Sequence, residues 1–187
     1  MIIPEKTATP TNLVTAGELL RLGSKGRYEL VEGVLIEMSP PGYEHGKTVS
    51  RVDRLIGDFV DQRHLGQVVV GDPGFRLSRN PDTVRAPDVA FVSKARLPAV
   101  LPTGYADFAP DLVVEVVSPG DDPDEIQAKV NDWLKAEVRL VLVVFPRTRQ
   151  VTAYRSLREV TSLTETETLT MPDLLPGFSA PVSHLFE

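Results

Sequence analysis

The sequence contains no cysteine, which excludes disulfide bonds, thiolate metal sites and a cysteine nucleophile. Its three histidines, His45, His64 and His184, are too dispersed along the chain to indicate a zinc cluster. The chain also lacks a glycine-rich phosphate-binding loop of the Walker or dinucleotide-binding type. These absences exclude several common enzyme classes and direct attention to the carboxylates, the lysines and the histidines.

No apolar run approaches the length needed to cross a bilayer. The first residues, MIIPEKTATPTN, lack the basic region and apolar segment of a secretory signal, so we expect a cytoplasmic protein with no membrane partner. Excess basic charge is absent too, since the formal net charge is −6. That acidity argues against a surface that wraps nucleic acid non-specifically, but it permits a local basic groove or a metal-holding cluster of acids.

What the chain does have is enough apolar material for one folded domain. Its 187 residues are 42% hydrophobic, and they contain no repeat and no internal linker. We therefore expect a single domain over residues 1–187 with a sizeable core. Residues 1–14 are expected to form an extended N-terminal segment.

Three segments carry helix signals. In TAGELLRLG, Thr15 and Glu18 have the spacing of a capping box, and a glycine suits the end of a short helix. Apolar residues recur at helical spacing from Tyr43 to about Leu65, which predicts a long amphipathic helix. A third helix is predicted from Pro123 to Lys135, with Asp122 as its N-cap.

The remaining apolar segments have the patterns of strands. RYELVEGVLIEMSP, centred on Glu32-Gly33, predicts a β-hairpin. Further strands are predicted in GQVVVGD, GFRLSRN, DVAFVSK, ADFAPDLVVEVVSP, VRLVLVVFP, QVTAYRS and EVTSLTETETLTM. This order of elements indicates an α/β (α+β) fold, in which one mixed β-sheet is flanked by helices and preceded by an N-terminal helix and the hairpin.

Glu115 stands between Val114 and Val116 in the strand segment DLVVEVVSP. Because side chains alternate along a strand, Leu112, Val114 and Val116 share one face and Glu115 points to the other. A lone ionised carboxylate there costs several kcal/mol unless a cation or hydrogen-bond donors meet it. A solvated face or structural ion pair and a functional carboxylate both explain this residue.

Asp88 begins the strand segment DVAFV directly after Pro87, at the rim of the predicted sheet, where a ligand can bind. An aspartate that satisfies turn amides is an equally good interpretation. His45 lies one helical turn before Val49 on the inner side of the long helix. It is either a partly buried structural histidine or a functional one.

Lys129 lies at the edge of an apolar helical stripe, three residues after Ile126 and four before Trp133. A lysine in this position either extends to solvent, paired with Glu125 or Asp132, or reaches a carboxylate inside. Two carboxylates can hold a hard divalent cation, and a nearby ammonium can steady an attacking water or developing phosphate charge. The combination therefore indicates metal-assisted phosphodiester hydrolysis.

Four segments, RYELVEGVLIEMSPPGYEH, RAPDVAFV, PDLVVEVVSPGD and KVNDWLKAEVRLVLVVFP, occur in this order. Over about residues 15–185 the chain resembles the Uma-two family of restriction endonucleases, a branch of the PD-(D/E)XK nuclease superfamily. The resemblance implies a restriction-endonuclease-like fold, with Asp88 in the PD pair and Glu115 as the second acid. It also implies that the Val116 carbonyl completes the metal site and that His45 borders it.

The chain departs from the superfamily pattern at Val117, where a lysine belongs two residues after the acid. The resemblance implies that Lys129 on the following helix takes over, since its long stem can approach the same point. Asp111 forms a second PD pair, but about 13 Å of strand separates it from Glu115, too far to share an ion. The roles of four acids stay open: Glu29, Glu32, Glu44 and Asp111.

We therefore predict a Mg²⁺-dependent endonuclease, with Mn²⁺ as a substitute, that uses Asp88, Glu115, Lys129 and His45. The expected partner is nucleic acid, with DNA favoured, and a homodimer or higher homo-oligomer would supply one site for each strand. Scattered arginines are candidate phosphate contacts: Arg51, Arg54, Arg76, Arg79 and Arg85.

Two other interpretations stay open. The chain could be a catalytically inactive nuclease-fold protein that serves as a nucleic-acid-binding or regulatory module. Alternatively, it could be an interaction protein in which Glu115 and Lys129 form a buried ion pair without any metal. Metal binding distinguishes these interpretations, because the ion pair needs no cation.

Overall fold

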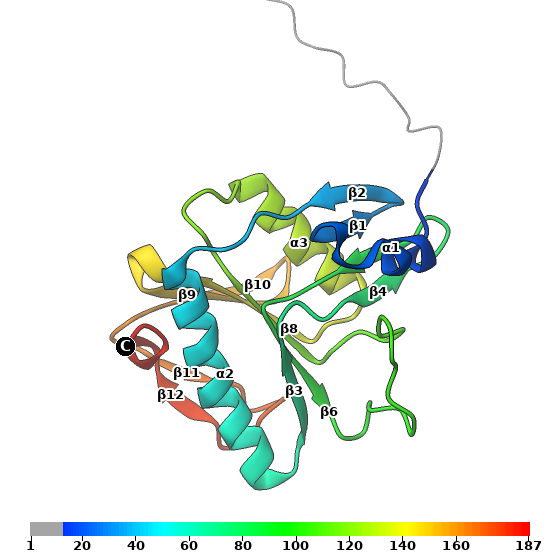
Figure 1. Cartoon of the computed structure of the whole chain (residues 1–187). Helices are drawn as coiled ribbons and strands as arrows, with labels where there is room; N and C mark the ends of the chain where they lie inside the picture. Colours follow the sequence, from blue (N-terminus) through cyan, green and yellow to red (C-terminus); the bar gives the residue numbers. More distant parts are fainter. Residues whose placement is uncertain (1–12) are drawn as a thin grey trace, which may run out of the picture.

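The computed structural model of the chain describes residues 13–187 (Figure 1). Its α-helices are α1 (Ala16–Leu22), α2 (Tyr43–Arg63) and α3 (Pro123–Lys135), and its 3-10 helices are η1 (Gly23–Lys25), η2 (Pro146–Thr148) and η3 (Val182–Leu185). Its strands are β1 (Tyr28–Val31), β2 (Val34–Glu37), β3 (Gly66–Val70), β4 (Phe75–Ser78), β5 (Thr83–Arg85), β6 (Val89–Ser93), β7 (Leu112–Val116), β8 (Leu140–Phe145), β9 (Gln150–Ser156), β10 (Glu159–Thr164), β11 (Thr168–Thr170) and β12 (Ser179–Pro181). Within the described residues, no helix has the length and apolar character needed to span a membrane.

The central sheet has six strands in the order β10-β9-β8-β7-β6-β3. All neighbouring pairs are antiparallel except β7 and β8, which are parallel and are connected through α3. In this parallel pair, Glu115 lies beside Val143 and Val116 lies beside Val144. The carboxyl ends of β7 and β8 therefore meet at one edge of the sheet.

Each face of the central sheet is covered by one helix. Val114 of β7 packs in a core with Val52 and Ile56 of α2, whereas Val113 packs in a second core with Trp133 of α3. In Figure 1, α2 runs along the sheet while α3 lies near the β1–β2 hairpin. The alternation along β7 is the predicted one, and it directs Glu115 toward α3.

The hairpin belongs to a separate four-stranded sheet in the order β2-β1-β5-β4. Its turn residues, Glu32 and Gly33, have φ values of 49° and 80°, as a two-residue turn that follows the strand twist requires. Leu30 of β1 and Val84 of β5 are neighbours in the register and pack with Leu19 of α1 in a third small core. β11 and β12 form a two-stranded sheet of their own.

The predicted fold is confirmed, because a mixed sheet flanked by helices follows an N-terminal helix and a hairpin. α1 carries the predicted capping box of Thr15 and Glu18. α3 has the predicted bounds, and the Asp122 side chain accepts a hydrogen bond from the Asp124 N–H. Of the expected extended segment, residues 1–12 lie outside the described residues, and Val14 donates to the Gly33 carbonyl at 2.8 Å.

The sequence did not indicate that the hairpin, β4 and β5 form a sheet of their own, and β5 was missed. β5 has only three residues, too few for its pattern to indicate a strand. The segment EVTSLTETETLTM was expected to be one strand but divides into β10 and β11. At the division, the Thr164 N–H and hydroxyl donate to the Glu167 carboxylate at 2.8 and 2.9 Å, which stabilises a turn.

Candidate active site

Asp88 lies immediately before β6, where it reaches the end of β7. Its Oδ2 accepts a hydrogen bond from the Val116 N–H at 2.7 Å. His45, in the first turn of α2, places its Nε2 3.2 Å from Asp88 Oδ1. The structure therefore brings three of the predicted site residues together from different elements.

Glu115 is buried in the central strand, with 7% of its surface exposed. Its Oε1 accepts a hydrogen bond from the Trp133 indole N–H at 2.7 Å, and its Oε2 lies 3.5 Å from the Lys129 ammonium. An apolar strand accommodates this carboxylate because a donor and a cation from α3 meet it. Sequence analysis had placed Trp133 only in the apolar stripe, since the indole N–H gives no signal in a hydrophobic pattern.

Lys129 points inward rather than to solvent, with 19% of its side chain exposed. Its ammonium lies 3.5 Å from Glu29 Oε1 and 3.5 Å from Glu115 Oε2. Of the two alternatives left open by the sequence, the pairing with an interior carboxylate is the one observed. Glu29, one of the acids without an assigned role, therefore belongs to the same cluster.

Burial is the main influence on the charge of Glu115. Loss of solvent raises the pKa of Glu115 to about 7, and the acids Asp88 and Glu29 raise it as well, while Lys129 and the Trp133 hydrogen bond lower it. Burial also opposes the charge on Lys129, but attraction to Glu115 and Glu29 outweighs it, so the pKa of Lys129 is raised. Lys129 thus stays charged at neutral pH while Glu115 titrates.

His45 experiences the same competition. Burial opposes its charge, but the hydrogen bond and attraction of Asp88, together with Asp121 and Asp72, leave the pKa of His45 raised. Its Nδ1 atom is buried and has no hydrogen-bond partner among residues 13–187. A buried polar atom without a partner is uncommon and suits a site completed by water or ligand.

A buried charge network adjoins these residues. Arg85 donates to Glu29 Oε2 from Nη1 at 2.7 Å, and to Asp132 Oδ2 from Nε at 3.0 Å and from Nη2 at 2.6 Å. The Ala86 N–H donates to Glu29 Oε1 at 3.0 Å. The expectation that Arg85 contacts phosphate is therefore wrong, because its guanidinium is buried and occupied by two carboxylates. No local pattern indicates this network, because its members lie in β1, β5 and α3.

The other candidate residues lie away from the cluster or are engaged elsewhere. Asp111 accepts from the Ser93 N–H at 2.8 Å and lies near two arginines at the opposite end of β7, as expected from its spacing. Glu32 is exposed in the hairpin turn and Glu44 is exposed in the first turn of α2. The remaining arginines contact partners within the chain: Arg51 the Glu187 carbonyl, Arg54 the Ser50 carbonyl, and Arg76 and Arg79 the Asp107 carboxylate.

All of the clustered residues line one open cleft of about 820 Å³. Its floor carries Glu29, His45, Asp88, Glu115 and Lys129, and its rim includes the segments 38–42 and 117–121. This volume is in the range of small-molecule sites and admits part of a polymeric substrate. The cleft is therefore the place where the predicted chemistry can occur.

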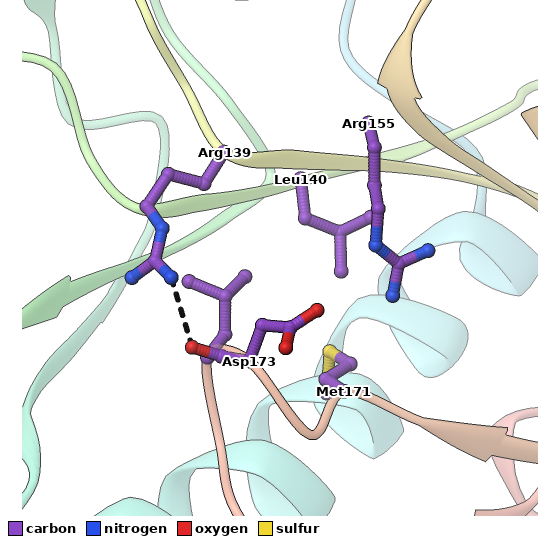
Figure 2. Close-up of a pocket in the computed structure, with 6 residues that line it drawn as sticks. Arg139, Leu140, Arg155, Met171 and Asp173 are labelled. Atoms are coloured by element: carbon purple, nitrogen blue, oxygen red, sulfur yellow. Dashed lines mark hydrogen bonds between the residues drawn. The ribbon is translucent and has the colours of Figure 1, made fainter. Parts of the chain in front are cut away.

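A second cavity of about 290 Å³ lies at the other end of the sheet. Figure 2 shows Arg139 donating to the Asp173 carbonyl, at 2.9 Å, with Arg155 across the cavity. Leu140 lines this cavity and pairs with Leu112 at the start of β7, whereas the cluster lies at the end of that strand. The second cavity contains none of the predicted site residues.

Acids outnumber bases among the residues that line the cleft: the acids are Glu29, Glu37, Asp72, Asp88, Glu115, Asp121 and Glu125, and the bases are Arg27, His45, Arg85 and Lys129. Among residues 13–187, no three His, Asp or Glu side chains are gathered closely enough to form a complete metal site. Mg²⁺ does not need such a cage, because it usually binds one or two carboxylates and keeps several waters. Asp88 and Glu115, which both line the cleft, therefore fit a Mg²⁺-like ion, with phosphate or water as further ligands.

Comparisons with known proteins agree with this geometry. The model of the family Uma2, described as "Putative restriction endonuclease", matches residues 16–183. A crystal structure from Anabaena variabilis, described as "a putative nuclease belonging to DUF820", is 19% identical and has a TM-score of 0.81, covering 92% of this chain and 97% of its own. At this identity the likeness supports the fold alone. No curated protein matches the chain.

Proposed function

Because the chain belongs to the Uma2 family, we propose that it is a metal-dependent nuclease that hydrolyses phosphodiester bonds, with DNA as substrate. The observation that carries this proposal is the buried Glu115, which lies in one cleft with Asp88 and a charged Lys129. Because its pKa is raised to about 7, a nearby cation would stabilise the ionised form of this carboxylate. Such perturbed groups in a cleft are typical of functional sites.

Asp88, Glu115 and the Val116 carbonyl are the residues that would hold Mg²⁺ or Mn²⁺. The ion would supply Lewis-acid polarisation of the phosphoryl group and acidify the attacking water. Lys129 keeps its ammonium charged at neutral pH and stabilises the negative charge that develops on the phosphate. His45, whose Nε2 lies 3.2 Å from Asp88 Oδ1, holds that carboxylate in position.

A competing function is a catalytically inactive module that binds nucleic acid. One observation favours it: both oxygens of Asp88 already contact the protein, at the Val116 N–H and at His45. In that case Glu115 and Lys129 form a structural ion pair. The nuclease has the stronger support, since an ion pair alone does not explain why the acids outnumber the bases around it.

The first experiment measures cleavage of supercoiled plasmid and of single-stranded oligonucleotides in Mg²⁺ or Mn²⁺. Wild type, Glu115→Gln and the control Asp111→Asn are compared, because Asp111 is an equally buried acid outside the cleft. We expect cleavage by wild type and Asp111→Asn that disappears in Glu115→Gln and in EDTA. Wild type that neither cuts nor binds a divalent metal would establish the inactive module instead.

We also propose an oligomeric state and a cellular location for this nuclease. A duplex presents two strands, so the nuclease acts as a homodimer or higher homo-oligomer. Its proposed location is the cytoplasm. Sedimentation velocity with and without DNA tests the assembly. A monomer that cuts both strands of one duplex without dissociating contradicts it.

A further inference from the structure

Glu29 is a buried carboxylate that the proposed chemistry does not use. Only 1% of its surface is exposed, and each oxygen has a partner. Oε2 accepts from Arg85 at 2.7 Å, while Oε1 accepts from the Ala86 N–H at 3.0 Å and lies 3.5 Å from the Lys129 ammonium. These three contacts, from a guanidinium, a backbone N–H and an ammonium, fix the Glu29 carboxylate in position.

These contacts form a closed circuit that begins and ends on α3. Lys129 pairs with Glu29, Glu29 with Arg85, and Arg85 with Asp132, which follows Lys129 by three residues on the same helix. Charges alternate along the circuit, so Glu29 and Arg85 each lie between two groups of opposite charge. The hairpin is thereby tied to α3 directly by the Glu29–Lys129 pair and indirectly through Arg85 of β5, which pairs with both Glu29 and Asp132.

The circuit contacts the segment before Asp88 and also includes Lys129, the ion-pair partner of Glu115. Ala86, whose N–H is held by Glu29, is two residues before Asp88. Lys129 is held between Glu29 and Glu115, at 3.5 Å from each. A lysine has a flexible four-carbon stem, so a single ion pair leaves its ammonium many alternative positions. The second carboxylate restricts it to the space between strand β7 and the hairpin.

We propose that Glu29 is a positioning residue that fixes Lys129 and the Asp88 segment relative to Glu115. This inference rests on the proposed nuclease function. Lys129 approaches Glu115 from a helix, so its position depends on how α3 is held. The hairpin supplies that constraint through Glu29, in addition to the contacts of α3 with the sheet.

The test compares Glu29→Gln with Asp111→Asn, since Asp111 is also 1% exposed and paired with arginines but lies outside the cleft. Plasmid cleavage gives kcat and KM. Mn²⁺ affinity is measured separately from the emission of Trp133, the only tryptophan of the chain, which donates to Glu115. We expect kcat of Glu29→Gln to fall about 10- to 100-fold through misplacement of reacting groups, with KM and Mn²⁺ affinity within about twofold of wild type.

A double variant separates positioning from a general loss of structure. If Glu29 acts through Lys129, then Glu29→Gln/Lys129→Met cleaves no more slowly than Lys129→Met, within about threefold, whereas independent effects multiply. Glu29→Asp provides a second variant if Glu29→Gln does not fold. This variant keeps the negative charge but shortens the side chain by one methylene. We expect a lower kcat and a free energy of unfolding close to that of wild type.

Each other outcome overturns the inference in an identifiable way. An inactive wild type removes the proposed nuclease function and this inference with it. Active wild type with unchanged kcat in Glu29→Gln, or equal losses in Glu29→Gln and Asp111→Asn, removes the positioning role alone. A roughly tenfold weaker Mn²⁺ affinity in Glu29→Gln makes Glu29 a metal ligand instead.

Discussion

Glu115 is a buried carboxylate that releases its proton near neutral pH. Its pKa is about 7 in the folded protein and 4.5 in the absence of the fold, so the folded state binds more protons between these values. Stability therefore falls as pH rises from about 4.5 through about 7, and it levels off above that range. The direction is opposite to that of a salt-bridged surface acid, whose stabilising effect appears as pH rises.

This direction gives the first prediction. Without divalent metal, wild type loses on the order of 3 kcal/mol of unfolding free energy between pH 4.5 and pH 8, from the shift at Glu115. Glu115→Gln, which cannot ionise, shows a much smaller loss. Urea unfolding at pH 4.5 and pH 8 measures this change in unfolding free energy, with Asp111→Asn as the control. Parallel pH profiles for wild type and Glu115→Gln would show that Glu115 is ionised throughout.

Trp133 offers a direct optical report on the same carboxylate. It is the only tryptophan, it is fully buried, and its indole N–H lies 2.7 Å from Glu115 Oε1. We expect its emission to change with a midpoint near pH 7, because ionisation of Glu115 alters the charge that faces the indole. Addition of Mn²⁺ at pH 8 changes the emission again. A profile in Glu115→Gln identical to that of wild type would assign the signal to another group.

At the scale of elements, α3 is the helix that carries Lys129 inward to Glu29 and Glu115. Lys129→Met leaves Glu115 without its ammonium in a buried position, so we predict a loss of about 3–5 kcal/mol in unfolding free energy at pH 8. Lys135→Met in the last turn of the same helix is the control and changes stability by less than about 0.5 kcal/mol. Below pH 5, protonated Glu115 needs no counter-charge, so the difference in unfolding free energy between the two variants becomes smaller. Equal losses at both pH values would indicate a packing role for Lys129.

The hairpin that presents Glu29 depends on its turn. Gly33 has a φ of 80°, and an added Cβ would lie 2.7 Å from the Leu13 Cβ, so we expect Gly33→Ala to destabilise the protein by about 1–3 kcal/mol. Gly46 lies inside α2 with nothing within 4 Å of an added Cβ, and Gly46→Ala is expected to stabilise by about 0.5–1 kcal/mol. Thermal unfolding compares the two variants. A stabilising Gly33→Ala would contradict the left-handed turn.

The same elements show what the sequence could predict and why it could not predict more. α3 had sharp start signals in Asp122 and Pro123, and the alternation around Glu115 correctly placed that carboxylate on the face opposite Val114 and Val116. Segments of this kind carry their own local pattern. β5 has three residues and no such pattern, so its sheet was missed.

For the site, the sequence identified single residues better than their partners. Asp88, Glu115, Lys129 and His45 lie in one cleft, and each was marked by a local irregularity, such as an acid in an apolar strand. Arg85 was misassigned because its partners, Glu29 and Asp132, are 56 and 47 residues away in sequence. Only the tertiary structure specifies pairings at such separations.

At the scale of the whole molecule, acidity determines how a polyanion can approach. The net charge is −6, and the cleft is lined by more acids than bases. Among the described residues, the arginines proposed as phosphate contacts already have partners in the chain. In the cleft itself, Arg27, Arg85 and Lys129 are each paired with carboxylates, so few cations there can exchange for the counterions of DNA, which is the usual source of non-specific affinity.

We therefore predict that DNA binding depends on a divalent cation. Ca²⁺, a hard ion that takes oxygen ligands, should tighten binding of a labelled duplex at least about tenfold relative to EDTA, because it offsets the acids of the cleft. The slope of log affinity against log salt should stay small, about −3 or shallower, since few phosphates are neutralised by side chains. Fluorescence anisotropy at several salt concentrations measures both quantities, with Asp88→Asn/Glu115→Gln as the variant that loses the Ca²⁺ effect. Tight binding in EDTA with a steep salt dependence would instead require a basic surface formed on assembly, and the binding stoichiometry would then have to exceed one chain per site.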